Sequence, residues 1–266
     1  MSTRSLLPGE VHLWMARYPQ FDDPVARARC DAVMSDEERS QTERFYFPDD
    51  RLRHRVTRAL LRNTLSRYAP VEAGAWRFTV NAYGRPAIDP GHGEARALSF
   101  NLSHTRGLIV LAVARDIDLG VDVENIRHRA APLDIADRFF STEEVAALAM
   151  LEAEARPRRF YEYWTLKESY IKARGMGLSL PLDGFAFSYT ATDAIALAID
   201  PALADDPERW EFWQWHPIDD CLIALCIQRR GDTVARIQAR LALPEGDAPI
   251  PLVPLRRSPA PVLRPR

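Results

Sequence analysis

Hydrophobic and polar residues alternate with a period of two along much of this chain, which predicts many short β-strands. Between them lie stretches with apolar residues three or four positions apart, the spacing of amphipathic helices. Ser35 with Glu38, and Ser141 with Glu144, match the capping-box pattern that opens a helix. Pro48 is expected to end the first of these helices. Strands are predicted at residues 10–16, 76–80, 98–102, 108–114, 119–124, 185–189, 195–199, 210–215 and 221–228.

A helix is predicted to open after Pro157 and to end at Gly175, which can adopt a left-handed conformation. Within it, Trp164, Glu168 and Lys172 are four residues apart, so their side chains form a stripe along one face. We expect Trp164 to belong to the core. Glu168 and Lys172 could simply pair on an exposed helix, or they could belong to a site.

The two halves of the chain repeat one order of parts, an opening strand, helices and a run of short strands. This order predicts an α+β fold of two pseudo-duplicated halves, each with helices packed on a small, mainly antiparallel sheet. We expect an N-terminal half at 1–118, a C-terminal half at 119–243 and a tail at 244–266. The tail is rich in proline, so we expect it to be extended and poorly ordered.

Composition excludes several classes of protein. The net charge is −2, which gives no general electrostatic attraction to nucleic acid or to a membrane surface. No apolar run is long enough to span a membrane, and the N-terminus lacks the pattern of a signal peptide. The three cysteines show neither a disulfide framework nor zinc-ligand spacing. These features predict a soluble cytoplasmic protein that binds neither nucleic acid nor membrane.

Residues 51–67 form an amphipathic helix whose polar side holds six arginines and His54 but no acid. The segment could be an ordinary solvated face or an anion-binding surface. If it binds an anion, a compact phosphate fits better than a duplex, because the basic run is short and the whole chain is mildly acidic.

Asp122 and Glu124 alternate with Val121 and Val123 on a predicted strand, so the two carboxylates share one face. Their repulsion must be offset either by solvent on an exposed sheet face or by a bound cation. Mg²⁺ suits such a pair, because it binds one or two carboxylates together with waters and substrate phosphates.

Two further segments could supply phosphate donors. Residues 103–107 form a predicted polar turn that contains Ser103 and His104, and Arg85 lies in a turn with glycine and proline on either side. Each could equally serve only to stabilise its turn. Together with the carboxylates and Lys172, these residues provide the groups that phosphoryl-type transfer requires, which are a metal site and cationic donors around a pyrophosphate.

The chain resembles the 4′-phosphopantetheinyl transferases of the larger, surfactin-synthetase-activating type. The resemblance covers roughly residues 35–190. It rests mainly on Gly-Val-Asp-Val-Glu at 120–124 and on Trp-Thr-Leu-Lys-Glu-Ser-Tyr-Ile-Lys at 164–172, followed by Gly175 and Gly177. Asn-Leu-Ser-His at 101–104 and Gly-Arg-Pro at 84–86 match two further motifs, and the segment around Arg53 matches less specifically.

This resemblance implies a monomeric enzyme that transfers 4′-phosphopantetheine from coenzyme A to a serine of an apo acyl or peptidyl carrier protein. By the same analogy, Lys172 neutralises the attacked phosphate or protonates the leaving group, and either Glu168 or a metal-bound hydroxide deprotonates the serine. The implied Mg²⁺ ligands are Asp122, Glu124 and Glu168; the implied coenzyme A ligands are Ser103 and His104 at the diphosphate and Arg53, His54 and Arg85 at the 3′-phosphate and adenine.

Two alternatives remain open from the residues alone. A Mg²⁺-dependent phosphodiesterase or nuclease could use the same carboxylates, although the basic stretch lacks the aromatics typical of nucleic-acid binding. A non-enzymatic module that binds a carrier protein or a nucleotide could carry the same motifs with an inactive site.

Overall fold

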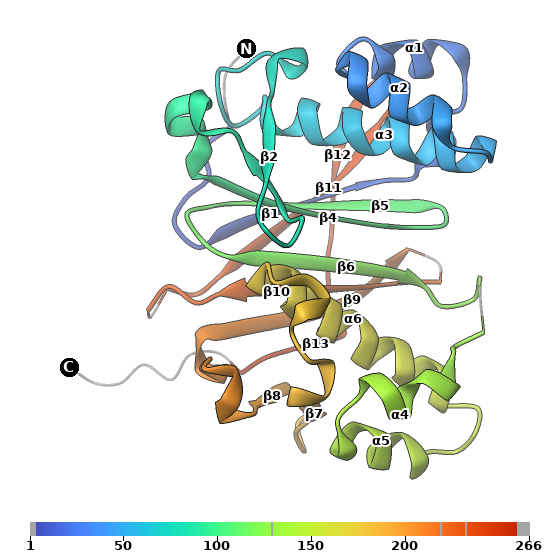
Figure 1. Ribbon diagram of the computed structural model, residues 1–266, viewed down its shortest axis with the longest axis vertical. Coiled ribbons are helices and arrows are strands. Elements are labelled where there is room, and N and C mark those ends of the chain that lie inside the picture. Colours follow the sequence, from blue (N-terminus) through green and yellow to red (C-terminus); the bar gives the residue numbers. More distant parts are fainter. Residues whose placement is uncertain (1–3, 129, 219, 232, 260–266) are drawn as a thin grey trace. The chain divides into compact units, whose positions relative to one another are not determined.

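The structure is a computed structural model that describes residues 4–128, 130–218, 220–231 and 233–259. The chain divides into two compact units (Figure 1). The first unit comprises residues 1–80, 86–116 and 236–251; the second comprises residues 81–85, 117–235 and 252–266. These units differ from the contiguous halves expected from the sequence, because two late strands return to the first unit and residues 81–85 belong to the second.

A five-stranded sheet in the order β12-β11-β1-β5-β4 forms the base of the first unit. β1 runs parallel to β11, and the other pairs are antiparallel. The strands are β1 (Glu10–Ala16), β4 (Leu98–Thr105), β5 (Leu108–Arg115), β11 (Arg236–Leu243) and β12 (Gly246–Ile250), while β2 (Phe78–Val80) pairs separately with β3 (Pro86–Ile88).

Three helices of the first unit lie on the same side of this sheet (Figure 1). They are α1 (Pro24–Asp31), α2 (Asp36–Arg44) and α3 (Pro48–Leu65). The apolar face of α3 is buried with Trp14 and Leu111 of the sheet, as the sequence pattern predicts. Pro48 begins α3, where a missing N–H costs no hydrogen bond, and α2 has already ended at Arg44.

The second unit contains the antiparallel sheet β13-β9-β10-β6. Its longest helix, α6 (Arg156–Arg174), packs against β6 and β10. The remaining elements are β6 (Leu119–Asn125), α4 (Ala136–Phe139), α5 (Thr142–Ala149), β7 (Phe185–Tyr189), β8 (Ile195–Ile199), β9 (Trp210–Ile218), β10 (Cys221–Gln228) and β13 (Arg256–Arg257). Aromatic side chains such as Phe160, Tyr170 and Phe212 dominate the core. The expected α+β class with small, mainly antiparallel sheets is confirmed in both units.

Two local expectations are wrong. β4 continues to Thr105, so Ser103 and His104 lie in a strand and not in the hairpin turn, because their backbone pairs with β5. The described part of the tail is not an unpaired extended segment: β12 pairs with β11, and β13 pairs with β9. Residues 260–266 lie outside the described part.

Among the described residues, no helix has both the length and the apolarity needed to cross a bilayer. Cys30, Cys221 and Cys226 are free thiols in buried positions.

Candidate active site

The centre of the second unit's candidate site is the contact between α6 and β6. A Cβ atom placed on Gly120 would lie 2.1 Å from the carbonyl oxygen of Ser169 and 2.4 Å from the amide nitrogen of Ala173. Only glycine permits this approach of strand and helix, since every other side chain would collide with the helix backbone. The close contact places the residues after Gly120 beside the last two turns of α6.

Lys172 on α6 forms an ion pair with Asp122 on β6. Its Nζ lies 2.6 Å from Asp122 Oδ1 and donates a second hydrogen bond to the carbonyl oxygen of Val121, at 3.2 Å. Asp122 is 5% exposed, so the alternative of a solvent-exposed sheet face is wrong at this residue. A buried carboxylate needs a cationic partner, and Lys172 supplies one.

Glu168 lies one turn before Lys172 and is half-buried. Burial raises the pKa of Glu168, the nearby charge of Asp122 raises it further, and Lys172 partly opposes the change. The two carboxylates are therefore close enough to interact, although they come from different elements. Trp164, the third member of the stripe, stacks on Phe160 with ring centroids 6.0 Å apart, as expected for a core residue.

Glu124 is half-buried on β6, two residues beyond Asp122 and on the same face of the strand. Across the described ranges, no three His, Cys, Asp or Glu side chains gather closely enough to form a ready-made metal site. The oxygen donors of Asp122 and Glu168 nevertheless suit Mg²⁺, which commonly takes one or two carboxylates and completes its octahedron with water and phosphate oxygens.

Lys167, next to Glu168 on α6, is fully buried. Its Nζ donates to the carbonyl oxygens of Leu182 and Phe185, both at 2.7 Å, and lies 2.8 Å from Glu144 Oε2. The side chain therefore anchors α6 within the second unit, and no described contact directs it toward Asp122.

Arg85 also belongs to the second unit. Its guanidinium donates to the carbonyl oxygens of Ala173, at 2.8 Å, and Leu119, at 3.3 Å, and lies 3.7 Å from Asp118. Arg85 thus joins the end of α6 to the start of β6, and burial lowers its pKa. The sequence had suggested a phosphate contact for this residue, which stays a prediction.

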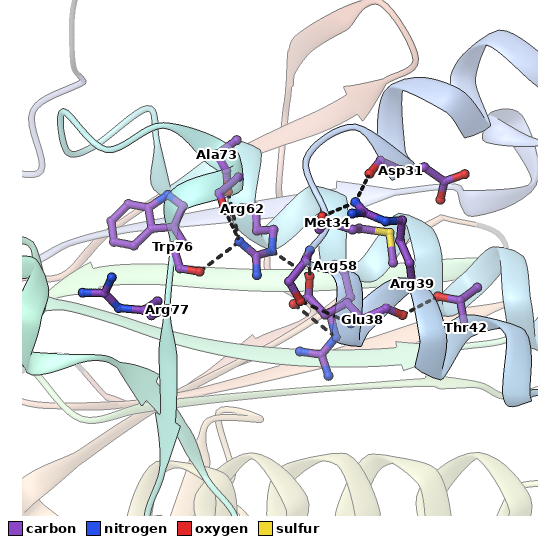
Figure 2. A network of polar contacts seen from close by, with 12 residues as sticks. Asp31, Met34, Glu38, Arg39, Thr42, Arg58, Arg62, Ala73, Trp76 and Arg77 are labelled. Atoms are coloured by element: carbon purple, nitrogen blue, oxygen red, sulfur yellow. Dashed lines mark hydrogen bonds and ion pairs between the residues drawn. The ribbon is translucent and has the colours of Figure 1, made fainter.

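In the first unit, acids from α2 and from the first turn of α3 itself neutralise much of the positive charge of α3. Figure 2 shows the buried Arg62 donating to Glu38 on α2, at 2.8 Å, and to the carbonyl oxygens of Ala73 and Trp76. Arg53 pairs with Asp49 and Asp50 in the first turn of its own helix. The acid-free sequence of residues 51–67 therefore does not imply an acid-free surface.

His54 and His104, which are fifty residues apart in the sequence, lie near each other in the first unit. Burial, then the charge of Arg58, lowers the pKa of His54 to about 4, and His104 contributes in the same direction. His54 Nδ1 is 2.8 Å from Thr42 Oγ1, which fixes the ring. Ser103 is buried and His104 is exposed on the adjacent position of β4.

Arg58 was missed as a candidate by the sequence reasoning. It lies one helical turn after His54, with its Nε 3.4 Å from His54 Nε2 and 4.0 Å from Glu38. Its spacing of four from His54 is the signal that could have identified it. Arg58 and His104 both disfavour the charged form of His54, whereas Glu38 favours it.

Two family models match the chain. One, described as the 4′-phosphopantetheinyl transferase superfamily, matches residues 118–226, and one described as the N-terminal part of 4′-phosphopantetheinyl transferase matches residues 23–116.

Curated relatives carry the same description. The 4′-phosphopantetheinyl transferase HetI of a Nostoc species is 34% identical over 224 residues, which cover 84% of this chain and 90% of the relative. The 4′-phosphopantetheinyl transferase Sfp of Bacillus subtilis is 34% identical over 169 residues, covering 62% and 72%. A solved holo-[acyl-carrier-protein] synthase of Thermotoga maritima aligns over 47% of this chain and 67% of its own length, at 19% identity and a TM-score of 0.35, which is too weak to identify a shared fold.

Proposed function

This chain belongs to the 4′-phosphopantetheinyl transferases, and we propose that it transfers the 4′-phosphopantetheine group of coenzyme A to a serine of an apo acyl or peptidyl carrier protein. The second product is adenosine 3′,5′-bisphosphate. The observation that carries the proposal is the meeting of Asp122 and Lys172, with Glu168 beside them, at the contact between β6 and α6.

We propose that Asp122, Glu124 and Glu168 hold a Mg²⁺ ion. The fit rests on their chemistry, since three carboxylates on two adjoining elements are hard oxygen donors and two of them already interact. When bound, the ion supplies charge neutralisation at the diphosphate of coenzyme A.

Glu168 is the proposed general base. The nucleophile is the serine hydroxyl of the carrier protein, whose oxygen forms a bond to the pantetheine-side phosphorus as the phosphoanhydride bond to the nucleotide breaks. The serine proton passes to the Glu168 carboxylate.

Lys172 is proposed to neutralise the phosphate oxygens that gain charge as the leaving group departs. Its side chain is 26% exposed, so Lys172 pairs with Asp122 while keeping access to solvent. A cation fixed beside the reacting phosphorus lowers the repulsion between the serine oxygen and the phosphodiester.

The residues of the first unit are proposed to bind the rest of coenzyme A. Ser103 and His104 are assigned to the diphosphate, and Arg53 and His54, with Arg85 of the second unit, to the 3′-phosphate and adenine. Support for an anion comes from Arg58, whose guanidinium lies beside His54, with its Nε 3.4 Å from His54 Nε2, and could pair with a phosphate.

We further propose that the protein acts as a monomer in the cytoplasm. One chain carries both the carboxylates and the phosphate-binding residues that the reaction requires. Its three cysteines are reduced and buried, which is typical of proteins that fold in a reducing compartment.

The experiment is incubation of the protein with coenzyme A, Mg²⁺ and a panel of apo carrier proteins, followed by intact-protein mass spectrometry. We expect at least one carrier to gain the mass of phosphopantetheine on its serine. Binding of coenzyme A without any mass gain would favour a non-enzymatic module. Hydrolysis of coenzyme A in the absence of a carrier would favour a phosphodiesterase.

A further inference from the structure

The first unit contains a cavity of about 770 Å³ between its helices and one end of its sheet. Helices α1 and α3 provide one wall, and Trp14 of β1 with the turn between β11 and β12 provides the other. The volume lies within the range of sites for small organic ligands. None of the proposed metal or coenzyme A ligands lines this cavity.

Three arginines from distant parts of the chain surround Trp14. The guanidinium carbons of Arg67, Arg4 and Arg240 lie 4.9, 5.5 and 5.7 Å from its ring. All three pair with one carboxylate, Asp247, with Arg67 Nη1 at 2.6 Å and Arg4 Nη2 at 3.4 Å. One acid therefore faces three cations, and the cluster keeps an excess of positive charge.

Arg4 and Arg67 line the cavity as well as belonging to this cluster. Their side chains are each 35% exposed, which places solvent at this end of the cavity. Arg29 and Glu72 are the other charged residues of the lining, and Arg29 pairs with Glu245 at 3.2 Å. The cluster around Asp247 thus gives the cavity a cationic end.

Away from the arginines most of the lining is apolar, although Asn63, Thr64, Ser66 and Glu72 also line the cavity. The wall is formed by Trp14 and by aliphatic and aromatic side chains, among them Phe21, Val56, Ala59, Leu60 and Leu243. A ligand that fills this space must present an apolar body to the wall and an anion to the guanidinium groups. The guanidinium pairing with Asp247 shows that this end accommodates a planar carboxylate.

We propose that this cavity is a binding site for a small amphipathic carboxylate, such as a medium-chain acyl carboxylate. The carboxylate pairs with Arg4 and Arg67, while the acyl chain lies against Trp14 and the aliphatic side chains of α3. The site is independent of the transferase reaction and of the residues assigned to it.

The test is isothermal titration calorimetry of the full chain with decanoate, and with decan-1-ol as an uncharged probe of similar shape. We expect decanoate to bind one site and decan-1-ol to bind at least about tenfold more weakly, because it cannot form the charge-assisted pair. Arg67→Gln should weaken decanoate binding by about tenfold for the same reason.

Three further variants locate the site. Ala59→Leu fills the wall from α3, and Asn63→Trp, on an exposed residue of the lining, obstructs the cavity without altering the core. Both should reduce binding of decanoate. Arg27→Gln, an exposed arginine of α1 outside the lining, is the matched control and should bind as the unchanged protein does.

Absence of decanoate binding would overturn the proposal. Equal affinity for decanoate and decan-1-ol would also overturn it, because the charge of the ligand would then play no role. Affinity for decanoate that is unchanged by both Arg67→Gln and Asn63→Trp would overturn it as well, because binding would then lie elsewhere.

Discussion

Lys172 on α6 reaches across to Asp122 on β6, with Nζ 2.6 Å from Oδ1, so an ammonium from the helix neutralises a buried carboxylate of the strand. The pairing joins the two motifs that carry the resemblance to 4′-phosphopantetheinyl transferases. It also differs from the simplest expectation for α6, an ion pair between Glu168 and Lys172 on an exposed helix face.

Replacement of Lys172 by methionine should lower kcat for carrier modification by about 100-fold or more, because the fixed positive charge beside the phosphate is lost. The KM for the carrier protein should change little. Mass spectrometry of the carrier in samples quenched at successive times, over a range of carrier concentrations, measures kcat and KM.

Arg158→Gln is the matched control for Lys172→Met, because Arg158 lies on the same helix. Its side chain is 51% exposed, and within the described part of the chain its ion pair is with Glu162. It should retain the rate of the unchanged protein. Equal rates for Lys172→Met and Arg158→Gln would contradict the role assigned to Lys172.

Gly120→Ala should reduce both stability and activity. The added methyl group would meet backbone atoms of Ser169 and Ala173, so α6 must move away from β6. Overpacking of this kind costs about 1–3 kcal/mol in the free energy of unfolding, and more where backbone must shift. Urea denaturation measures the loss. Gly74→Ala, where a Cβ meets no atom within 4 Å, should be close to neutral.

Lys167→Met should destabilise the protein more than the double variant Lys167→Met/Glu144→Gln, in which the amide oxygen can still accept one of the hydrogen bonds that Glu144 takes from the backbone amides of Ser141 and Phe187. Both side chains are 0% exposed, so the single change leaves Glu144 as an uncompensated buried charge, at a cost of about 3–5 kcal/mol. The double variant removes both charges. Urea denaturation of the two variants provides the comparison, and equal losses would show that the pairing is not what stabilises the structure.

His54 makes stability depend on pH. Burial and then Arg58 lower the pKa of His54 to about 4, below the value of 6.5 for an unperturbed histidine. Between these two values the unfolded chain binds a proton that the folded chain does not, so stability falls as the pH falls through this window. His54→Asn should therefore lose less stability than the unchanged protein on going from about pH 7 to about pH 5.

The urea midpoint at the two pH values gives this difference. His216→Asn, at an exposed position, is the control and should keep the full pH dependence. A pH dependence for His54→Asn as steep as that of the unchanged protein would contradict the assignment.

Features set by nearby residues could be predicted from the sequence. The capping boxes at Ser35 and Ser141 are both present, and α6 ends at Gly175 with a positive φ of 66°. The alternation in residues 119–124 gives the correct strand, although both of its faces are buried, with Val121 and Val123 on one side and Gly120 and Asp122 on the other.

Features set by distant partners could not be predicted. β11 was not predicted because it pairs with β1, which lies more than two hundred residues earlier in the sequence. β12 was not predicted because its proline, Pro249, suggested disorder, whereas this residue lies in a paired edge strand. The basic helix likewise gave no sign of Glu38, the acid from α2 that pairs with Arg62.

The most direct test of the central claim, that the carboxylates at the contact of β6 and α6 carry out the transfer, is the rate at which an apo carrier gains phosphopantetheine. It should be measured with saturating coenzyme A and Mg²⁺ for the unchanged protein, Asp122→Asn and Glu168→Gln, each shown to be folded. We predict that both variants lose at least about 100-fold in rate. Unchanged rates in both folded variants would contradict the claim.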